Sequence, residues 1–81
     1  MPLAFVLIST ESGTEREVLE NIKKIPEVKN AHMVYGLHDI IAMIEANTME
    51  GLREITTKKI RQLDRIRSTM TLIVKDNPPH A

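Results

Sequence analysis

The apolar positions of the chain fall into blocks whose spacing predicts strands and helices in the order β-α-β-β-α-β. The first block, 2–10, is apolar at six successive positions, which predicts a strand covered on both faces. The second block is predicted to form a helix that begins at Thr14, three residues before Glu17 in capping-box spacing, and that Pro26 ends. Its apolar residues share one stripe: Val18, Leu19, Ile22 and Ile25.

The middle of the chain is predicted to form a β-hairpin. Two β-prone runs, 28–35 and 39–46, flank a short loop that contains Gly36. Gly36 can take a positive φ at little cost, and Asp39 can bond nearby backbone N–H groups and fix the turn. The loop also offers free backbone N–H groups beside an imidazole, His38, so it is the best candidate in the chain for holding a small polar ligand. The alternative is a turn with no ligand.

A second helix and a last strand complete the pattern. Thr48 is a suitable N-cap for a helix over 49–63, whose apolar side chains fall within a limited arc. Lys59 lies inside this arc, so we expect its stem to pack at the edge and its ammonium to reach water. Residues 66–75 are rich in β-branched side chains and predict the fourth strand.

This order is typical of the ferredoxin-like βαββαβ fold, an α+β fold whose four-stranded antiparallel sheet carries two helices on one face. The first and third strands are the most apolar and are predicted to be central, while the more polar second and fourth are predicted edges. The face without helices is still largely apolar. A second copy's sheet is the most economical cover, so we expect a dimeric α/β sandwich.

Length, charge and cysteine content narrow the function. Eighty-one residues make one domain with a small core, which favours oligomerisation. Eleven basic and eleven acidic residues give zero net charge, and Phe5 and Tyr35 are the only aromatics, so direct binding to nucleic acid is not expected. There is no apolar run of about 20 residues, no signal-peptide pattern and no cysteine, so we expect no membrane span and a cytoplasmic location.

Three motifs in the chain match a known family. The first runs from Val34 to Ile41 and reads as an aromatic residue, Gly-x-x-Asp and an apolar run. The second is a Thr-x-Thr pattern that leads into an apolar run within 67–74, and the third is the Ile-Pro-Glu-Val segment 25–28. With these motifs the chain resembles the C-terminal effector domain of the Lrp/AsnC transcription regulators, also called the regulation-of-amino-acid-metabolism (RAM) domain. The resemblance predicts a domain over 3–76 and a flexible tail over 77–81.

The resemblance also implies an assembly and a ligand site. Sheets of such domains pair into dimers, dimers assemble into rings, and amino-acid effectors bind between dimers. Carried over to this sequence, it implies a site for an amino acid or related metabolite, in which Asp39 accepts from the ligand ammonium while loop N–H groups and Thr hydroxyls donate to its carboxylate. The residues so implied are Tyr35, Gly36, Leu37, His38, Asp39, Thr69 and Thr71.

Two departures from the family pattern change what we expect of this chain. The chain begins at the first strand of the effector domain, without the helix-turn-helix that such regulators usually carry, so it resembles a stand-alone effector-domain protein. We expect it to act on transcription through mixed assemblies with full-length Lrp/AsnC-type regulators rather than by binding DNA itself. Before the last strand, Arg65-Ile66 replaces the family's frequent Gly-Val, so that turn is expected to differ in shape.

Other functions stay open at this point. The chain could be a structural oligomerisation partner with no ligand. It could be a small dimeric α/β-barrel-type enzyme using His32, His38, Asp39 and Tyr35 for acid–base chemistry, although no catalytic set is readable from their spacing. His32, His38 and Asp39 could also hold zinc, but without close ligand spacing, so neither a metal nor a cofactor is expected. Each Thr of the last strand could equally be an ordinary β-branched strand residue.

Overall fold

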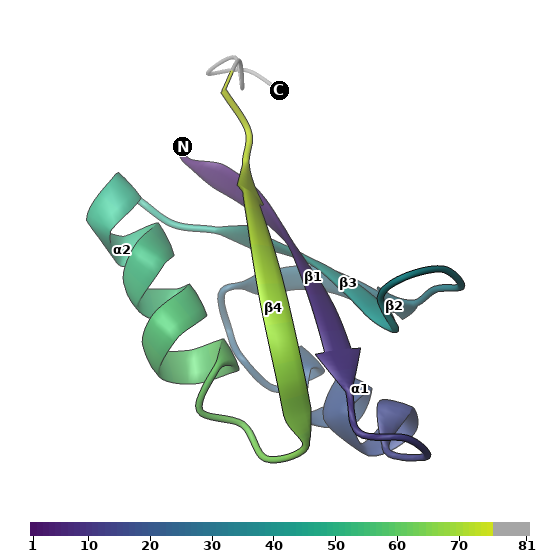
Figure 1. Ribbon diagram of the computed structural model, residues 1–81. Coiled ribbons are helices and arrows are strands. Elements are labelled where there is room, and N and C mark those ends of the chain that lie inside the picture. The colour runs from purple at the N-terminus through teal and green to yellow at the C-terminus, as the bar shows by residue number, and fades with distance from the viewer. Residues whose placement is uncertain (76–81) are drawn as a thin grey trace.

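The computed structural model of the chain describes residues 1–75 and shows a four-stranded sheet with two helical segments (Figure 1). The predicted order of elements is confirmed. The predicted tail, 77–81, lies outside the described residues. The elements are β1 (Leu3–Thr10), α1 (Glu15–Lys23), β2 (Val28–Met33), β3 (Ile40–Glu45), α2 (Met49–Glu54), η1 (Ile55–Ile60) and β4 (Ile66–Ile73).

The strands lie in the order β2-β3-β1-β4, and every neighbouring pair is antiparallel. The prediction of central first and third strands with polar edge strands is therefore confirmed, and so is the ferredoxin-like fold. In the register of the sheet, Leu7 of β1 stands opposite Ile41 of β3 and Met70 of β4. All three side chains project from the same face, because directly opposed residues share a face of the sheet.

The two faces of the sheet differ in burial. Ala4, Val6 and Ile8 of β1 point toward the helices and are fully buried. The alternate residues of β1 point to the other face and are only half-buried within one chain. We call this second face the open face, and its apolar residues are Leu3, Phe5, Leu7, Ile41, Met43, Met70 and Leu72. We predicted that β1 would be covered on both faces, but this chain covers it on one face only.

The first helix does not form the predicted capping box. Thr14 is the N-cap residue, but its hydroxyl donates to the Glu11 carbonyl at 2.7 Å rather than accepting from the helix. A carboxylate does accept from a backbone N–H before the helix, but it is that of Glu15, which accepts from the Gly13 N–H at 2.9 Å. The predicted start of the helix is confirmed, since Thr14 is the N-cap, but the Thr14–Glu17 capping box does not form, because the Thr14 hydroxyl bonds to the turn before the helix. The helix ends at Lys23, before Pro26, as predicted.

The second helix begins as predicted and changes its winding halfway. The Thr48 hydroxyl accepts from the Gly51 N–H at 3.0 Å, which confirms this cap. From Ile55 the helix becomes a π-helix that ends at Ile60, three residues short of the prediction. The hydroxyls of Thr56 and Thr57 donate to the carbonyls four residues earlier, at 3.2 and 2.9 Å. This competition for the helical acceptors favours the wider winding.

Two polar contacts fix the end of this helix against the rest of the fold. The Lys59 ammonium donates to both carboxylate oxygens of Glu27, at 2.9 and 2.8 Å. This hydrogen bond lowers the pKa of Glu27 from its usual value of 4.5. Lys59 was predicted to lie at the edge with its ammonium in water. The ammonium therefore also forms an ion pair with Glu27.

The turn before β4 keeps the backbone that a glycine would favour. Arg65 has φ 73°, in the left-handed region. Its carbonyl accepts from the Glu11 N–H at 2.9 Å, and its guanidinium lies 3.8 Å from a Glu11 oxygen and 4.0 Å from a Glu17 oxygen. Arg65 thus adopts a conformation that glycine favours at the position where the family often carries glycine.

Candidate functional site

The loop between β2 and β3 projects from the side of the sheet opposite α2 (Figure 1). Gly36 has φ 131°, so the prediction of a positive φ is confirmed. The Val34 N–H donates to the Asp39 carbonyl at 2.9 Å and closes the loop, and the Asp39 N–H donates to the Ile8 carbonyl at 2.9 Å. Tyr35 and Leu37 have relative exposures of 106% and 96%, so the tip presents two apolar side chains to solvent.

The carboxylate of Asp39 joins the base of this loop to the end of β1. One of its oxygens accepts from the Thr10 N–H at 2.8 Å and from the Thr10 hydroxyl at 3.4 Å. Asp39 thus bonds a backbone N–H as predicted, although across to the next strand rather than within its own turn. The neighbouring His38 ring approaches Ser9 in the same way, with 3.1 Å between Nδ1 and Oγ.

A polar cavity of about 420 Å³ lies beside Asp39, where β1 ends and β4 begins. It combines two carboxylates, a guanidinium and several hydroxyls. Arg67 forms no ion pair with any residue in the range 1–75, so its charge is available to a ligand. We call it the polar cavity, and its lining residues are Ser9, Thr10, Ser12, Glu15, Leu37, Asp39, Arg67 and Ser68.

A second cavity, of about 400 Å³, lies on the other side of the same two acids. Glu15 and Asp39 line both cavities, and Met33, Val34 and Tyr35 complete the second. The predicted loop residues are therefore brought together around Asp39: Leu37 lies on one side and Tyr35 on the other.

The two predicted threonines of β4 lie elsewhere. Thr69 stands opposite Ile8 and Thr71 opposite Val6, so both side chains project from the helix-covered face. Thr71 lines a groove of about 200 Å³ between the second helix and β4, which contains neither Tyr35 nor Leu37. One chain does not bring all seven predicted residues to one place.

Six residues of the polar cavity were missed by sequence reasoning: Ser9, Thr10, Ser12, Glu15, Arg67 and Ser68. For Ser9, Thr10, Arg67 and Ser68 the signal lies in the topology, because the end of β1 and the start of β4 are antiparallel neighbours. The strand register pairs Ser9 with Ser68 directly. A reader who assigned the sheet order from the sequence could have placed these polar ends side by side.

The candidate zinc site does not form. No group of three His, Cys, Asp or Glu side chains within residues 1–75 is arranged to hold a metal ion. His32 stands opposite Ile41 on the open face, whereas His38 and Asp39 face the end of β1. Among the helices of residues 1–75, none has the length and apolar character needed to span a membrane.

Comparison with known proteins places this fold and its motifs in one family. The family model for the Lrp/AsnC ligand binding domain matches residues 3–80. An uncharacterised HTH-type transcriptional regulator of Pyrococcus abyssi is 35% identical over 72 residues, which are 89% of this chain and 46% of that protein. A similar regulator of Pyrococcus furiosus is 38% identical over 73 residues, which are 86% of this chain and 49% of that protein.

Solved structures of other proteins are also similar to this chain. The crystal structure of FFRP-DM1 is 43% identical, with a TM-score of 0.88 over 93% of this chain and 100% of the other. Escherichia coli AsnC is 28% identical, with a TM-score of 0.88 over 95% of this chain and 52% of AsnC. The chain spans about half the length of the curated regulators that it matches. With its fold, its hairpin motif and this family match, the chain belongs to the Lrp/AsnC family, as a ligand-binding domain.

Proposed function

We propose that the chain is an effector-binding regulatory domain that holds an amino acid or a related metabolite at the Tyr35–Asp39 loop. The observation that carries this proposal is the polar cavity, in which Asp39 and Arg67 provide opposite charges beside several hydroxyls. A zwitterionic ligand needs an acceptor for its ammonium and a donor for its carboxylate, and this cavity offers both. Leu37 lines the same cavity and gives an apolar side chain of the ligand a contact.

The family supports the ligand class. The relatives are named as transcriptional regulators, and the matching family model is described as a ligand binding domain. A regulator of Neisseria meningitidis that is 17% identical, and therefore shares the fold alone, was solved in complex with L-Met. These are properties of the family and of that protein, and they favour an amino acid over other zwitterions for this chain.

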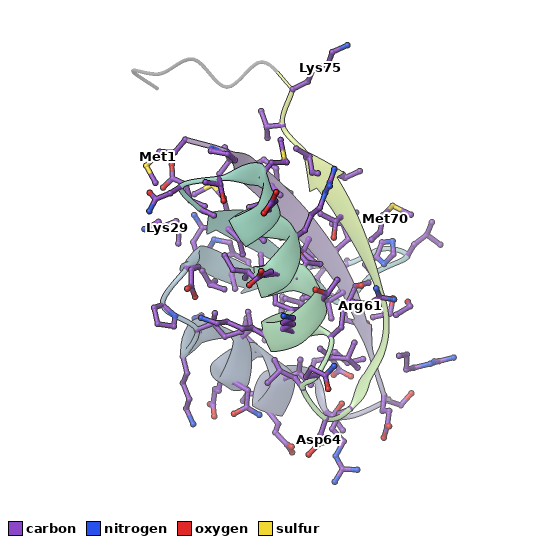
Figure 2. The ribbon with its side chains drawn as sticks, turned by 90° about the vertical axis from the view of Figure 1, so that its left-hand side faces the viewer. Met1, Lys29, Arg61, Asp64, Met70 and Lys75 are labelled. Carbon is purple, nitrogen blue, oxygen red and sulfur yellow. The ribbon has the colours of Figure 1, made fainter. Side chains whose placement is uncertain are left out.

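We propose further that two copies pair through their open faces. Phe5 stands between Met43 and Leu72 in one row of that face, and Leu7 stands between Ile41 and Met70 in the next. Met70 and Leu72 are 50% and 49% exposed within one chain. Figure 2 shows Met70 projecting from β4 away from the second helix. Such a contiguous apolar surface is typical of an interface rather than of a solvated sheet.

The proposed regulatory role is supported by the family to which the chain belongs. Its relatives are regulators of about twice its length. Copies of this domain can join mixed assemblies with such full-length Lrp/AsnC-type regulators and pass the ligand signal to them. A structural oligomerisation role without a ligand is the competing function, and the polar cavity favours the effector role over it.

The ligand proposal is tested by thermal-shift screening of the twenty amino acids on the wild type and two variants. A ligand stabilises the fold that binds it, so a true ligand raises the melting temperature in a concentration-dependent way. Asp39→Asn keeps an acceptor for the Thr10 N–H but loses the charge, and Arg67→Gln removes the guanidinium from a side chain that has no ion-pair partner within 1–75.

Each variant is expected to weaken binding by about 1.5–3 kcal/mol, the range for a charge-assisted hydrogen bond. When no ligand is present, Arg67→Gln should keep the melting temperature of the wild type, and Asp39→Asn should lose less than about 1 kcal/mol of stability. Lys58→Gln, a charge removed from the far end of the helix layer, is the matched control and should bind normally. A wild type that no amino acid stabilises at millimolar concentration would favour the structural role instead.

A further inference from the structure

Three charged side chains of the polar cavity have no counter-ion within residues 1–75. They are the carboxylates of Glu15 and Asp39 and the guanidinium of Arg67, and none of the three forms an ion pair with any residue in that range. A ligand that complements all three carries two cationic groups and one anionic group. We propose that Glu15 makes the polar cavity selective for an amino acid with a cationic side chain, such as L-lysine.

The two carboxylates are partly buried, and each has an oxygen left for a ligand. Oδ2 of Asp39 accepts from Thr10, and Oε1 of Glu15 accepts from the Gly13 N–H. Within residues 1–75, the second oxygen of each carboxylate accepts no hydrogen bond. A partly buried carboxylate loses hydration, and a cationic donor that meets it there replaces the lost interaction. Each acid therefore gains from a ligand cation of its own.

The basic side chains near these acids do not neutralise them. The Arg65 guanidinium, just before β4, lies 3.8 Å from a Glu11 oxygen and 4.0 Å from a Glu17 oxygen. Arg67 lines the cavity but does not pair with either of its acids, so the lining carries two negative charges and one positive charge. A neutral amino acid leaves the excess negative charge in place. An amino acid with a cationic side chain cancels it, which is a basis for discrimination between the two.

The rest of the cavity wall suits a polar side chain better than a large apolar one. Of the eight residues that line it, four carry hydroxyls and only Leu37 is apolar. The hydroxyls of Ser12 and Ser68 form no hydrogen bond within residues 1–75, so they are available to polar groups of a ligand. Leu37 offers a contact to a methylene stem, the apolar part of a lysine side chain. The volume, about 420 Å³, lies in the range of small-ligand sites.

The second cavity, on the other side of the same two acids, is also favourable to a positive charge. Within residues 1–75, its lining contains no Lys, Arg or His. Tyr35 lines it, and the face of an aromatic ring attracts a cation. A ligand cation placed at the two acids therefore meets no repulsion from this side. On the polar side the one positive group is Arg67, which the carboxylate of the ligand would engage.

Glu15 also has a structural role, because an acid in the first turn of a helix stabilises that helix. Glu17 shares this turn of α1, but it is exposed, lies near Arg65 and lines neither cavity. Replacing either residue by Gln removes one negative charge from the same turn, so Glu17→Gln is the matched control. In Glu15→Gln the amide oxygen keeps an acceptor for the Gly13 N–H.

The test is isothermal titration calorimetry with three probes: L-lysine, L-norleucine, which is lysine without its side-chain ammonium, and cadaverine, which is lysine without its carboxylate. The wild type should bind L-lysine at least about tenfold more tightly than either of the others, because each lacks one charge-assisted contact. In Glu15→Gln the advantage of L-lysine over L-norleucine should disappear, while the affinity for L-norleucine stays within about twofold of the wild type. Glu17→Gln should keep the full preference for L-lysine.

Three results would overturn this selectivity. They are a wild type that binds L-norleucine or cadaverine as tightly as L-lysine, a Glu15→Gln variant that still prefers L-lysine, and a Glu17→Gln variant that loses the preference too. In the last case the effect would come from the helix and not from the cavity.

The selectivity rests on the proposed function, and the two failures are distinguishable. If L-norleucine binds tightly and its binding needs Asp39 and Arg67, the effector site stands and only the role of Glu15 is wrong. If neither L-lysine nor any other amino acid binds, the proposed function fails and the selectivity fails with it.

Discussion

Replacing Asp39 by Ala should destabilise the fold even without a ligand. The carboxylate accepts from the Thr10 N–H at 2.8 Å, and Thr10 is only 4% exposed. Removing the acceptor leaves a buried backbone donor unpaired, which costs about 1–3 kcal/mol, and the lost bond is charge-assisted, so the upper part of that range applies. We therefore expect the free energy of unfolding to fall by about 1.5–3 kcal/mol.

For a domain of this size, each kcal/mol lowers the melting temperature by about 4–8 °C, so the variant should melt roughly 6–24 °C below the wild type. The assay is thermal unfolding by circular dichroism at one fixed protein concentration, because assembly itself stabilises a folded chain. Asp39→Asn keeps an acceptor for the Thr10 N–H and should lose less than about 1 kcal/mol. Thr10→Val removes only the hydroxyl, whose bond is long at 3.4 Å, and should change stability little.

The result that would refute this reasoning is an Asp39→Ala variant within about 0.5 kcal/mol of the wild type. In that case the carboxylate would not support the end of β1. The effect of Asp39→Ala on ligand binding could then be measured directly, with no correction for a weakened loop.

Three further predictions concern other parts of the fold. Arg65→Gly should stabilise the chain by up to about 1 kcal/mol in urea unfolding, because it relieves a left-handed residue while losing only weak exposed ion pairs; a variant less stable than Arg65→Ala would contradict this. Glu27 has a lowered pKa in the folded state, so its contribution is complete above pH 4.5 and is lost as the pH falls through that lower pKa. Glu27→Gln should therefore be less stable than the wild type at neutral pH, and the difference should shrink as the pH falls below 4.5; a difference that does not change with pH would refute it. Leu7→Asp should give monomers in sedimentation velocity, because it puts an unpaired charge in the middle of the open face, whereas Met49→Asp should not; a dimeric Leu7→Asp would exclude this face as the interface.

The fold could be predicted from the sequence because its signals are local. The uniform apolar runs identified β1 and β3 as central strands, and Thr48 and Pro26 marked helix boundaries at which the structure agrees. The π-helix could not be predicted, because it depends on hydroxyl bonds that Thr56 and Thr57 make only once a helix is present. The capping partners of α1 were predicted wrongly for a related reason. The spacing of Thr14 allows a capping box, but it cannot reveal that the preceding turn uses the same hydroxyl.

The candidate site was predictable only where it lies within one segment. The loop with Gly36 and Asp39 is contiguous, and its backbone followed from residue types. Most of the rest of the polar cavity is formed by the start of β4 and the end of β1, which are more than fifty residues apart in sequence and meet only through the sheet order. Arg67 carries no local signal, since an exposed arginine at a strand start is common in any sheet.

The sequence alone did not determine which residues of β4 face the helices and which face the open side. This orientation bears on the proposed assembly. A strand with one covered face normally directs its larger apolar side chains to that face. The middle of β4 departs from this: Thr69 and Thr71 face the helices between Ile66 and Ile73, while Met70 and Leu72 face the open side. A shift of the register by one residue would exchange the two sets, so the register is expected to be selected by what each face contacts. Burying Met70 and Leu72 requires a surface that residues 1–75 of one chain do not provide, and this register also leaves Thr71 in the groove beside the second helix.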